Sequence, residues 1–244
     1  MKKILITLLV LFLSFNKSDL YAQSGFRFYL GYNAFFTSKK GLEDLNYIFK
    51  RYNENRPSLT KKLESVGNLS GAAFKMSLGT RGFIADLTYA RGGQKQYAEG
   101  PNSNGDIQRK QVKTRYTNLE AAFGYAPQGI NSPVVVGLSC DMISLNVYTR
   151  SGAPDNINKV QWAKPGNPAS LGLGPFIRLT SPGKKGLSAE FYFRRDVAPQ
   201  AGRRGLLNLN VSMNPQSWHT DTDDLGWIGH QAGIRIMFTF TTTK

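Results

Sequence analysis

The segment of this 244-residue chain that comes nearest to a hydrolytic site lies close to its C-terminal end. It runs Ser217-Trp-His219-Thr-Asp221-Thr-Asp223-Asp224. A serine nucleophile, a histidine base and an orienting carboxylate are the groups that acyl hydrolases use. Nothing in the spacing fixes their mutual geometry, and the same residues are common in a solvated loop. We therefore expect no catalytic residue here.

The carboxylates of this segment are also weak metal ligands. Asp221, Asp223 and Asp224 offer the oxygen atoms that Ca²⁺ prefers, but neither a loop glycine nor a bidentate glutamate completes a calcium loop. His230 begins the last alternating segment, where a histidine is more often an interfacial side chain than a base. The sequence contains no phosphate loop, metal cluster or cofactor motif. We expect neither a metal nor a cofactor.

Nine other charged residues occur in segments in which apolar and polar residues alternate. In residues 231–240 the even positions are apolar, and the odd positions are mostly polar or small. Strict alternation over ten residues predicts a β-strand with two unlike faces. Residues 26–36 repeat the pattern over a length that suits a tilted strand crossing a membrane.

The chain contains eight such segments, and their connections alternate between long and short. The segments are approximately 26–36, 69–78, 83–89, 119–125, 134–142, 171–179, 187–193 and 231–240. Pro175 lies inside the sixth segment and predicts a bulge or a local break in the ladder. In the long first connection, residues 37–68, apolar residues recur at helical spacing before and after Pro57, which predicts two short amphipathic helices.

One face of these eight segments is nearly free of charge, while the other carries five cations and four anions. These are Arg27, Lys75, Asp86, Glu120, Asp141, Arg178, Glu190, Arg194 and Arg235. An arginine or lysine that faced lipid at the midplane would cost about 2–4 kcal/mol. The segregation therefore predicts an all-β, eight-stranded antiparallel up-and-down transmembrane barrel with lipid outside. Its narrow interior would be filled by paired charges with a structural role.

The two ends of the chain fit an exported protein. Lys2 and Lys3 precede an apolar run at residues 4–15, and Ala22 is a suitable cleavage residue, which predicts a signal peptide at 1–22 and a barrel domain at 23–244. Near the other end, a polar residue, a glycine and two apolar residues recur at fixed spacing: Gln231, Gly233, Ile236 and Phe238. This pattern resembles the signal by which outer-membrane β-barrel proteins of Gram-negative bacteria are recognised for insertion. The resemblance implies a small, porin-like barrel of the outer membrane and contact with the barrel-assembly machinery.

The strongly basic composition indicates anionic partners. The net charge is +15, and Cys140 is the only cysteine, so no internal disulfide can form. For an exported protein, lipopolysaccharide phosphates are nearer candidates than nucleic acid. Basic residues concentrate in the first connection and before the fourth strand: Lys39, Lys40, Lys50, Arg51, Arg56, Lys61, Lys62, Arg109, Lys110, Lys113 and Arg115. They are either a solvated surface or a clamp on lipid phosphates or an acidic partner, with Lys61, Lys62, Lys110 and Lys113 as the candidate contacts.

The sequence therefore predicts a non-enzymatic outer-membrane barrel with a surface-binding or envelope-structural role. Two alternatives remain open. One is an outer-membrane lipid hydrolase or acyltransferase that uses the segment from Ser217 to Asp224. The other is an accessory barrel of a secretion or motility machine.

Overall fold

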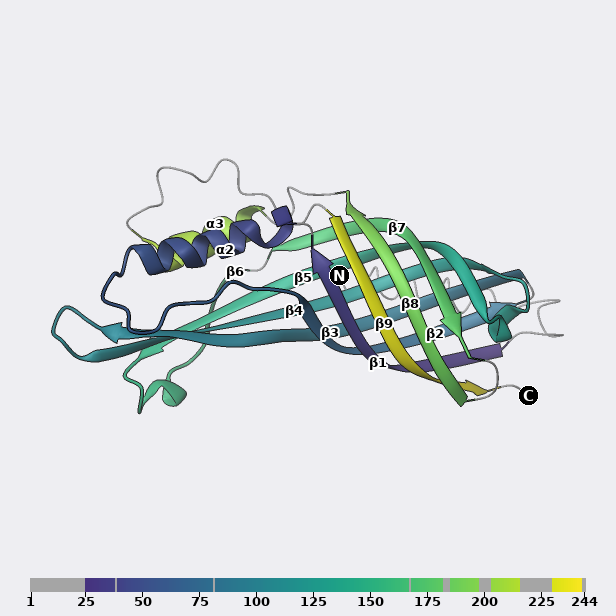
Figure 1. The fold of residues 1–244 in the computed structure, drawn as a ribbon, viewed down its shortest axis with the longest axis horizontal. Helices are drawn as coiled ribbons and strands as arrows, with labels where there is room; N and C mark the ends of the chain where they lie inside the picture. The colour runs from purple at the N-terminus through teal and green to yellow at the C-terminus, as the bar shows by residue number, and fades with distance from the viewer. Residues whose placement is uncertain are drawn as a thin grey trace.

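Eight antiparallel strands close into a barrel in the computed structural model, which describes residues 25–37, 39–80, 82–166, 168–181, 185–197, 203–215 and 230–242 (Figure 1). The strands of the ring are β1 Gly25–Thr37, β2 Leu69–Thr80, β3 Gly82–Pro101, β4 Ile107–Ala126, β5 Val134–Gly152, β7 Ala169–Thr180, β8 Lys185–Asp196 and β9 His230–Thr242. Each pairs with the next, and β9 pairs with β1 to close the ring. A short strand, β6 Ala163–Gly166, pairs with β5 outside the ring. The predicted fold class is confirmed.

The alternation of the sequence places apolar side chains outside the barrel and charged ones inside. Phe123, Leu138 and Phe238 are more than 60% exposed, whereas Lys75 and Arg235 are completely buried. All nine predicted interior charges are buried. A soluble barrel would have the opposite distribution, because charged side chains are almost never fully buried without a partner.

The two ends of the barrel differ in the length of their connections. Gly25 and Thr242 lie at the end that carries the short turns, as the pairing of Gly25 with Gly79 and of Phe26 with Thr242 shows. A short 3-10 helix, η2 Gly129–Asn131, joins β4 to β5 at this end. At the opposite end β3, β4 and β5 continue past the barrel wall as a three-stranded sheet (Figure 1). We call this sheet, residues 93–101, 107–115 and 145–152, the extension.

Two helices, α2 Lys39–Glu54 and α3 Arg203–Met213, cover one face of the extension (Figure 1). Apolar residues of both helices and of the strands below them form a buried core: Leu45, Ile48, Phe49, Leu206, Leu209, Val112, Tyr116 and Leu145. The rings of Phe35 and Tyr116 meet edge to face with 4.9 Å between centroids. Apolar packing therefore closes the barrel interior at this end. No helix in the described part of the chain is long and apolar enough to span a membrane.

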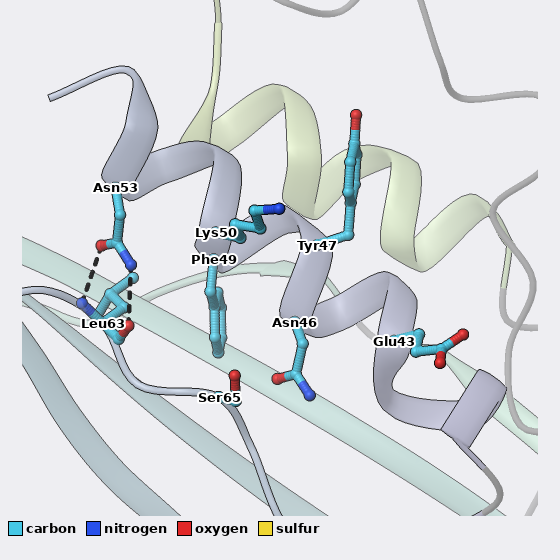
Figure 2. Close-up of a pocket in the computed structure, with 8 residues that line it drawn as sticks. All are labelled: Glu43, Asn46, Tyr47, Phe49, Lys50, Asn53, Leu63 and Ser65. Carbon is cyan, nitrogen blue, oxygen red and sulfur yellow. Dashed lines mark hydrogen bonds between the residues drawn. The ribbon is translucent and has the colours of Figure 1, made fainter.

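The second helix predicted in the first connection is wrong. Residues 55–68 form an irregular segment, which we call the strap, and two asparagine side chains of α2 hold it (Figure 2). Asn53 donates to the carbonyl of Leu63 at 2.9 Å and accepts from its N–H at 2.9 Å. Asn46, two helical turns earlier, donates to the carbonyl of Val66 at 3.0 Å and accepts from its N–H at 2.6 Å. The apolar residues at helical spacing are buried as predicted, but side-chain amides rather than a helix satisfy their backbone.

Replacing Asn53 with alanine should loosen the strap. The substitution removes both partners of the backbone of Leu63, a buried residue, and each unsatisfied group costs about 1–3 kcal/mol. We expect faster proteolytic cleavage between residues 55 and 68 in the detergent-solubilised protein. Ser65→Ala, which removes an exposed hydroxyl of the strap, is the control. Equal cleavage rates in the two variants would contradict this role of Asn53.

The local break predicted at Pro175 is confirmed. The ladder between β7 and β8 pairs Leu173 with Arg195 and Phe176 with Tyr192, and within these described strands it skips the two residues between. Proline has no N–H to donate. Arg194 bridges the gap, because its Nη1 donates to the carbonyl oxygen of Pro175 at 3.1 Å.

Candidate functional site

Eight of the nine predicted interior charges form one ion-pair network inside the barrel. At its centre, both terminal nitrogens of Arg235 bind the carboxylate of Glu120 at 2.7 and 2.6 Å. Arg235 also reaches Glu190 at 2.6 Å, and Arg194 reaches Glu120 at 2.8 Å. On one side of this centre, Lys75 contacts Glu190 and Asp86, and Arg178 binds Asp86 at 2.8 Å. On the other side, Arg194 approaches Asp141 at 4.0 Å.

The ninth interior charge, Arg27, lies apart from this network. Its Nη2 donates to the side chain of Asn131 in η2, 3.2 Å away. None of the nine charged residues is more than 3% exposed. The eight members of the network are shielded from solvent and pair with one another, so compensating charges fill the interior of the barrel.

The four residues of the predicted assembly signal lie on β9. Ile236 and Phe238 point outward and Gln231 is buried. Gly233 has a local structural role, because a Cβ atom there would lie 2.1 Å from Cζ of Tyr192. The hydroxyl of that tyrosine donates to Asn33 at 3.0 Å. Recognition of these residues by the assembly machinery stays a prediction.

The outer face of the barrel changes from apolar to basic where the extension begins. Tyr89, Leu119 and Met142 pair with one another and form the last apolar row. Two residues further along β3, about 7 Å beyond, comes Arg91 on the same face. The next outward positions on β3 and β4 carry three more cations: Lys95, Lys113 and Arg115.

These four cations surround a cavity of about 330 Å³, which we call the basic hollow. Gly93 lies between them, and a Cβ atom there would meet the carbonyl oxygen of Thr114 at 2.0 Å, so only glycine allows the two strands to approach this closely. No carboxylate lines the cavity. In the described part of the chain none of the four cations forms an ion pair.

The neighbouring cations disfavour the charged form of Lys113. Desolvation and then the charges of Arg115, Lys95, Arg91 and Arg150 lower the pKa of its ammonium group. An anion in the basic hollow would relieve this repulsion. The described residues that line the hollow therefore leave its positive charge uncompensated.

Trp162 borders the hollow on the β5 side. Its ring lies 5.9 Å from Nζ of both Lys95 and Lys113, and 4.4 Å from the guanidinium carbon of Arg150. Arg150 is in turn held by the side chains of Gln111 at 2.8 Å and Asn158 at 2.7 Å. An aromatic ring beside several cations offers a flat apolar surface next to an anion site.

The four predicted anion contacts do not come together. Lys113 lines the basic hollow, whereas Lys110 lies on the opposite face of the same strand, beneath α2. Lys61 and Lys62 are exposed on the strap, with Lys61 Nζ 4.0 Å above the ring of Tyr97. Arg91 and Lys95 are not among the predicted contacts, although their odd numbers continue the outward series that ends at Tyr89.

A further cavity of about 440 Å³ lies between α2 and the strap (Figure 2). Asn46 and Asn53 line it, and both amides are engaged by the strap. The residues from Ser217 to Asp224 lie outside the described part of the chain. Among the described residues, no three His, Cys, Asp or Glu side chains gather as a metal site.

No family model and no curated protein matches the chain. Among solved structures, it is similar to Ail, the attachment invasion locus protein of Yersinia pestis, in complex with the heparin analogue sucrose octasulfate. The identity is 9% over 90% of this chain and 99% of that chain, with a TM-score of 0.47. A second Ail structure is 8% identical over 90% of this chain and 97% of that chain, with a TM-score of 0.42. Neisserial surface protein A (NspA) is 9% identical over 91% of this chain and 98% of that chain, with a TM-score of 0.36. The eight-stranded architecture follows from the strand pairing itself, without support from these similarities.

Proposed function

We propose that this chain is a non-enzymatic outer-membrane β-barrel protein that binds the phosphate groups of outer-leaflet lipid through the basic hollow. The observation that carries the proposal is the position of the four cations. They lie on the outward face, directly beyond the last apolar row of β3, β4 and β5. At that level a membrane-embedded barrel meets lipid headgroups.

The apolar outer face supports a membrane setting. Large side chains on every strand of the ring are at least 40% exposed, including Leu30, Phe74, Phe83, Phe123, Leu138, Ile177, Phe191 and Phe238. A soluble monomer rarely exposes a contiguous apolar patch of more than a few hundred Å². Hydrocarbon contact removes this surface from water and leaves the strand backbones paired around the closed ring.

The arrangement of the two ends agrees with an outward-facing extension. Small outer-membrane barrels have short periplasmic turns and long external loops. By this rule Gly25 and Thr242 face the periplasm, and the extension with α2 and α3 faces the exterior. Lipopolysaccharide is the phosphate-bearing lipid of that leaflet, and arginine and lysine at a membrane surface each contribute about 1 kcal/mol to binding anionic lipid.

Removing two cations from the basic hollow should reduce lipid retention. Lys113→Gln combined with Arg115→Gln should remove about 2 kcal/mol of binding free energy, or about 30-fold in affinity. Native mass spectrometry of the detergent-extracted protein would measure the bound lipopolysaccharide. Lys61→Gln combined with Lys62→Gln changes the charge equally on the exposed strap and should retain the lipid. Equal retention by both double variants would refute the proposal.

A lipid hydrolase or acyltransferase would leave a chemical trace that a binding protein does not. The mass of lipid A from a strain that lacks the protein separates the two functions. We expect an unchanged lipid A mass, and an altered acylation pattern would overturn the non-enzymatic assignment.

A further inference from the structure

The face of the extension opposite the basic hollow contains a second basic cavity, of about 300 Å³. Its floor is formed by Ala98 and Gly100 of β3 and by Lys110 of β4. Tyr52 and Arg56, from the end of α2 and the turn after it, close it from the other side. Further polar groups line it: Ser58, Asn102, Ser103, Gln108 and Ser151.

Among the residues that the structure describes, two of the three cations in this cavity lack a counterion. Arg109 is neutralised by Glu99, with an Nη2–Oε2 distance of 2.6 Å. Arg56 instead stacks 4.0 Å above the ring of Tyr52 and donates to the carbonyl of that residue at 3.3 Å. Neither Arg56 nor Lys110 forms an ion pair in the described part of the chain, and no carboxylate lines the cavity.

The charged form of Lys110 is disfavoured in this cavity. Burial and, secondly, the charge of Arg56 lower the pKa of its ammonium group. Desolvating a cation beside a like charge is unfavourable unless an anion compensates for it. The cavity therefore lacks about two negative charges.

We propose that this cavity binds a phosphate monoester, with Arg56 and Lys110 as the cations that hold the phosphate. A monoester carries a charge close to −2 at neutral pH, which matches the two uncompensated cations. The guanidinium of Arg56 is suited to phosphate oxygens, and Lys110 supplies a point charge. The serine and amide groups are placed to bind hydroxyl groups of an attached sugar. This site is separate from the basic hollow and does not depend on it.

The shape of the cavity depends on Gly100. A Cβ atom at this position would lie 2.8 Å from Cα of Leu59, so glycine lets the turn after α2 approach the sheet. Together with Ala98 it leaves the floor without bulky side chains. Small residues therefore leave room for a ligand, and Arg56 and Lys110 match the negative charge of that ligand.

Isothermal titration calorimetry on the full chain in detergent tests the proposal. Glucose 6-phosphate and inorganic phosphate should bind, and uncharged glucose should not. Lys110→Gln and Arg56→Gln should each weaken binding at least about tenfold, since each removes a charge-assisted contact. The titrations use the Lys113→Gln/Arg115→Gln background, so that the basic hollow does not contribute to phosphate binding. In this background Lys62→Gln, which removes an exposed lysine of the strap that lines neither cavity, should leave the affinity unchanged. The phosphorylated disaccharide from deacylated lipid A serves as a second ligand, and whether it or glucose 6-phosphate binds more tightly identifies a lipid or a soluble source.

Two results would overturn the proposal. One is the absence of phosphate binding in the Lys113→Gln/Arg115→Gln background, and the other is an equal loss of affinity when Lys110→Gln or Lys62→Gln is added to it. Because Lys110→Gln removes a repelled cation, its unfolding temperature should not fall, so weaker binding would not reflect misfolding. The basic hollow is tested separately, by the lipopolysaccharide retention of the Lys113→Gln/Arg115→Gln variant, so the two proposals can fail independently.

The pH dependence of binding gives a further test of Lys110. Affinity should rise as the monoester loses its second proton near pH 6, a typical value for phosphate esters. It should fall at alkaline pH once Lys110 deprotonates, and the lowered pKa brings this fall to a lower pH than for an ordinary lysine. Lys110→Arg keeps its charge and should abolish the alkaline decline. A decline that persists in Lys110→Arg would exclude Lys110 as its cause.

Discussion

Replacing Glu120 with alanine is expected to lower the free energy of unfolding of the barrel by about 3–5 kcal/mol, as for other broken buried ion pairs. Glu120 accepts hydrogen bonds from both terminal nitrogens of Arg235 and from Nη2 of Arg194. Without its carboxylate, the buried guanidinium groups of Arg194 and Arg235 lose the anion that they share. Arg235 would retain Glu190, whereas Arg194 would retain Asp141 only at 4.0 Å.

Heat modifiability on gels and the thermal midpoint in detergent would measure the loss. Glu64→Ala, which removes an exposed carboxylate from the strap, is the matched control and should leave both unchanged. Glu190→Ala should behave like Glu120→Ala, because Glu190 joins Arg235 to Lys75. An unaltered midpoint in both interior variants would rule out a structural role for the network.

Replacing Leu138 with arginine is expected to cost about 2–4 kcal/mol and to reduce the amount of folded protein in the membrane. Leu138 is 61% exposed and pairs with Phe123 on one side and Pro175 on the other, well inside the apolar band. In a soluble protein such a surface substitution would change stability by no more than about 0.5 kcal/mol. The effect therefore discriminates between lipid and water around the barrel.

Ile107→Arg provides the control for this prediction. Ile107 is also exposed, but it lies at the tip of the extension, far beyond the last apolar row. We expect it to fold and reach the outer membrane like the unaltered protein. If Leu138→Arg and Ile107→Arg accumulate equally in the folded form, hydrocarbon does not surround the barrel.

The alternation of the sequence was sufficient to predict the ring and its two faces. A side-chain period of two assigns each strand residue to one face without knowledge of the partners. Every predicted interior charge is buried, and outward residues such as Phe123 and Phe238 are exposed. The predicted alternation of long and short connections is also present, because the short turns lie at one end of the barrel and the extension lies at the other.

Individual ion pairs could not be predicted, because they depend on strand register. Arg235 and Glu120 are 115 residues apart in the sequence and meet across the interior rather than along one ladder. The basic sites had a different difficulty. Lys110 and Lys113 were grouped by proximity in sequence, but an odd separation along a strand places them on opposite faces.

Two features at the covered face of the extension show the limits of helical spacing as a signal. The residues Leu206, Leu209 and Met213 recur at helical spacing and form the buried side of α3. The polar residues around them made this helical pattern hard to recognise in the sequence. Leu63 and Val66 have similar spacing, yet they belong to the strap. Asn46 and Asn53 explain the difference, because their amides take the place of helical hydrogen bonds, which no apolar pattern reveals.

The position of Arg235 on the final strand has a consequence for the order of assembly. Glu120 on β4 and Glu190 on β8 share this one arginine, which the chain supplies only with β9. A nascent sheet that lacks β9 holds these two acids without their common counterion and remains open to water. Ring closure therefore adds the last cation of the network and balances its four anions with four cations, so we expect closure without a stable seven-stranded intermediate.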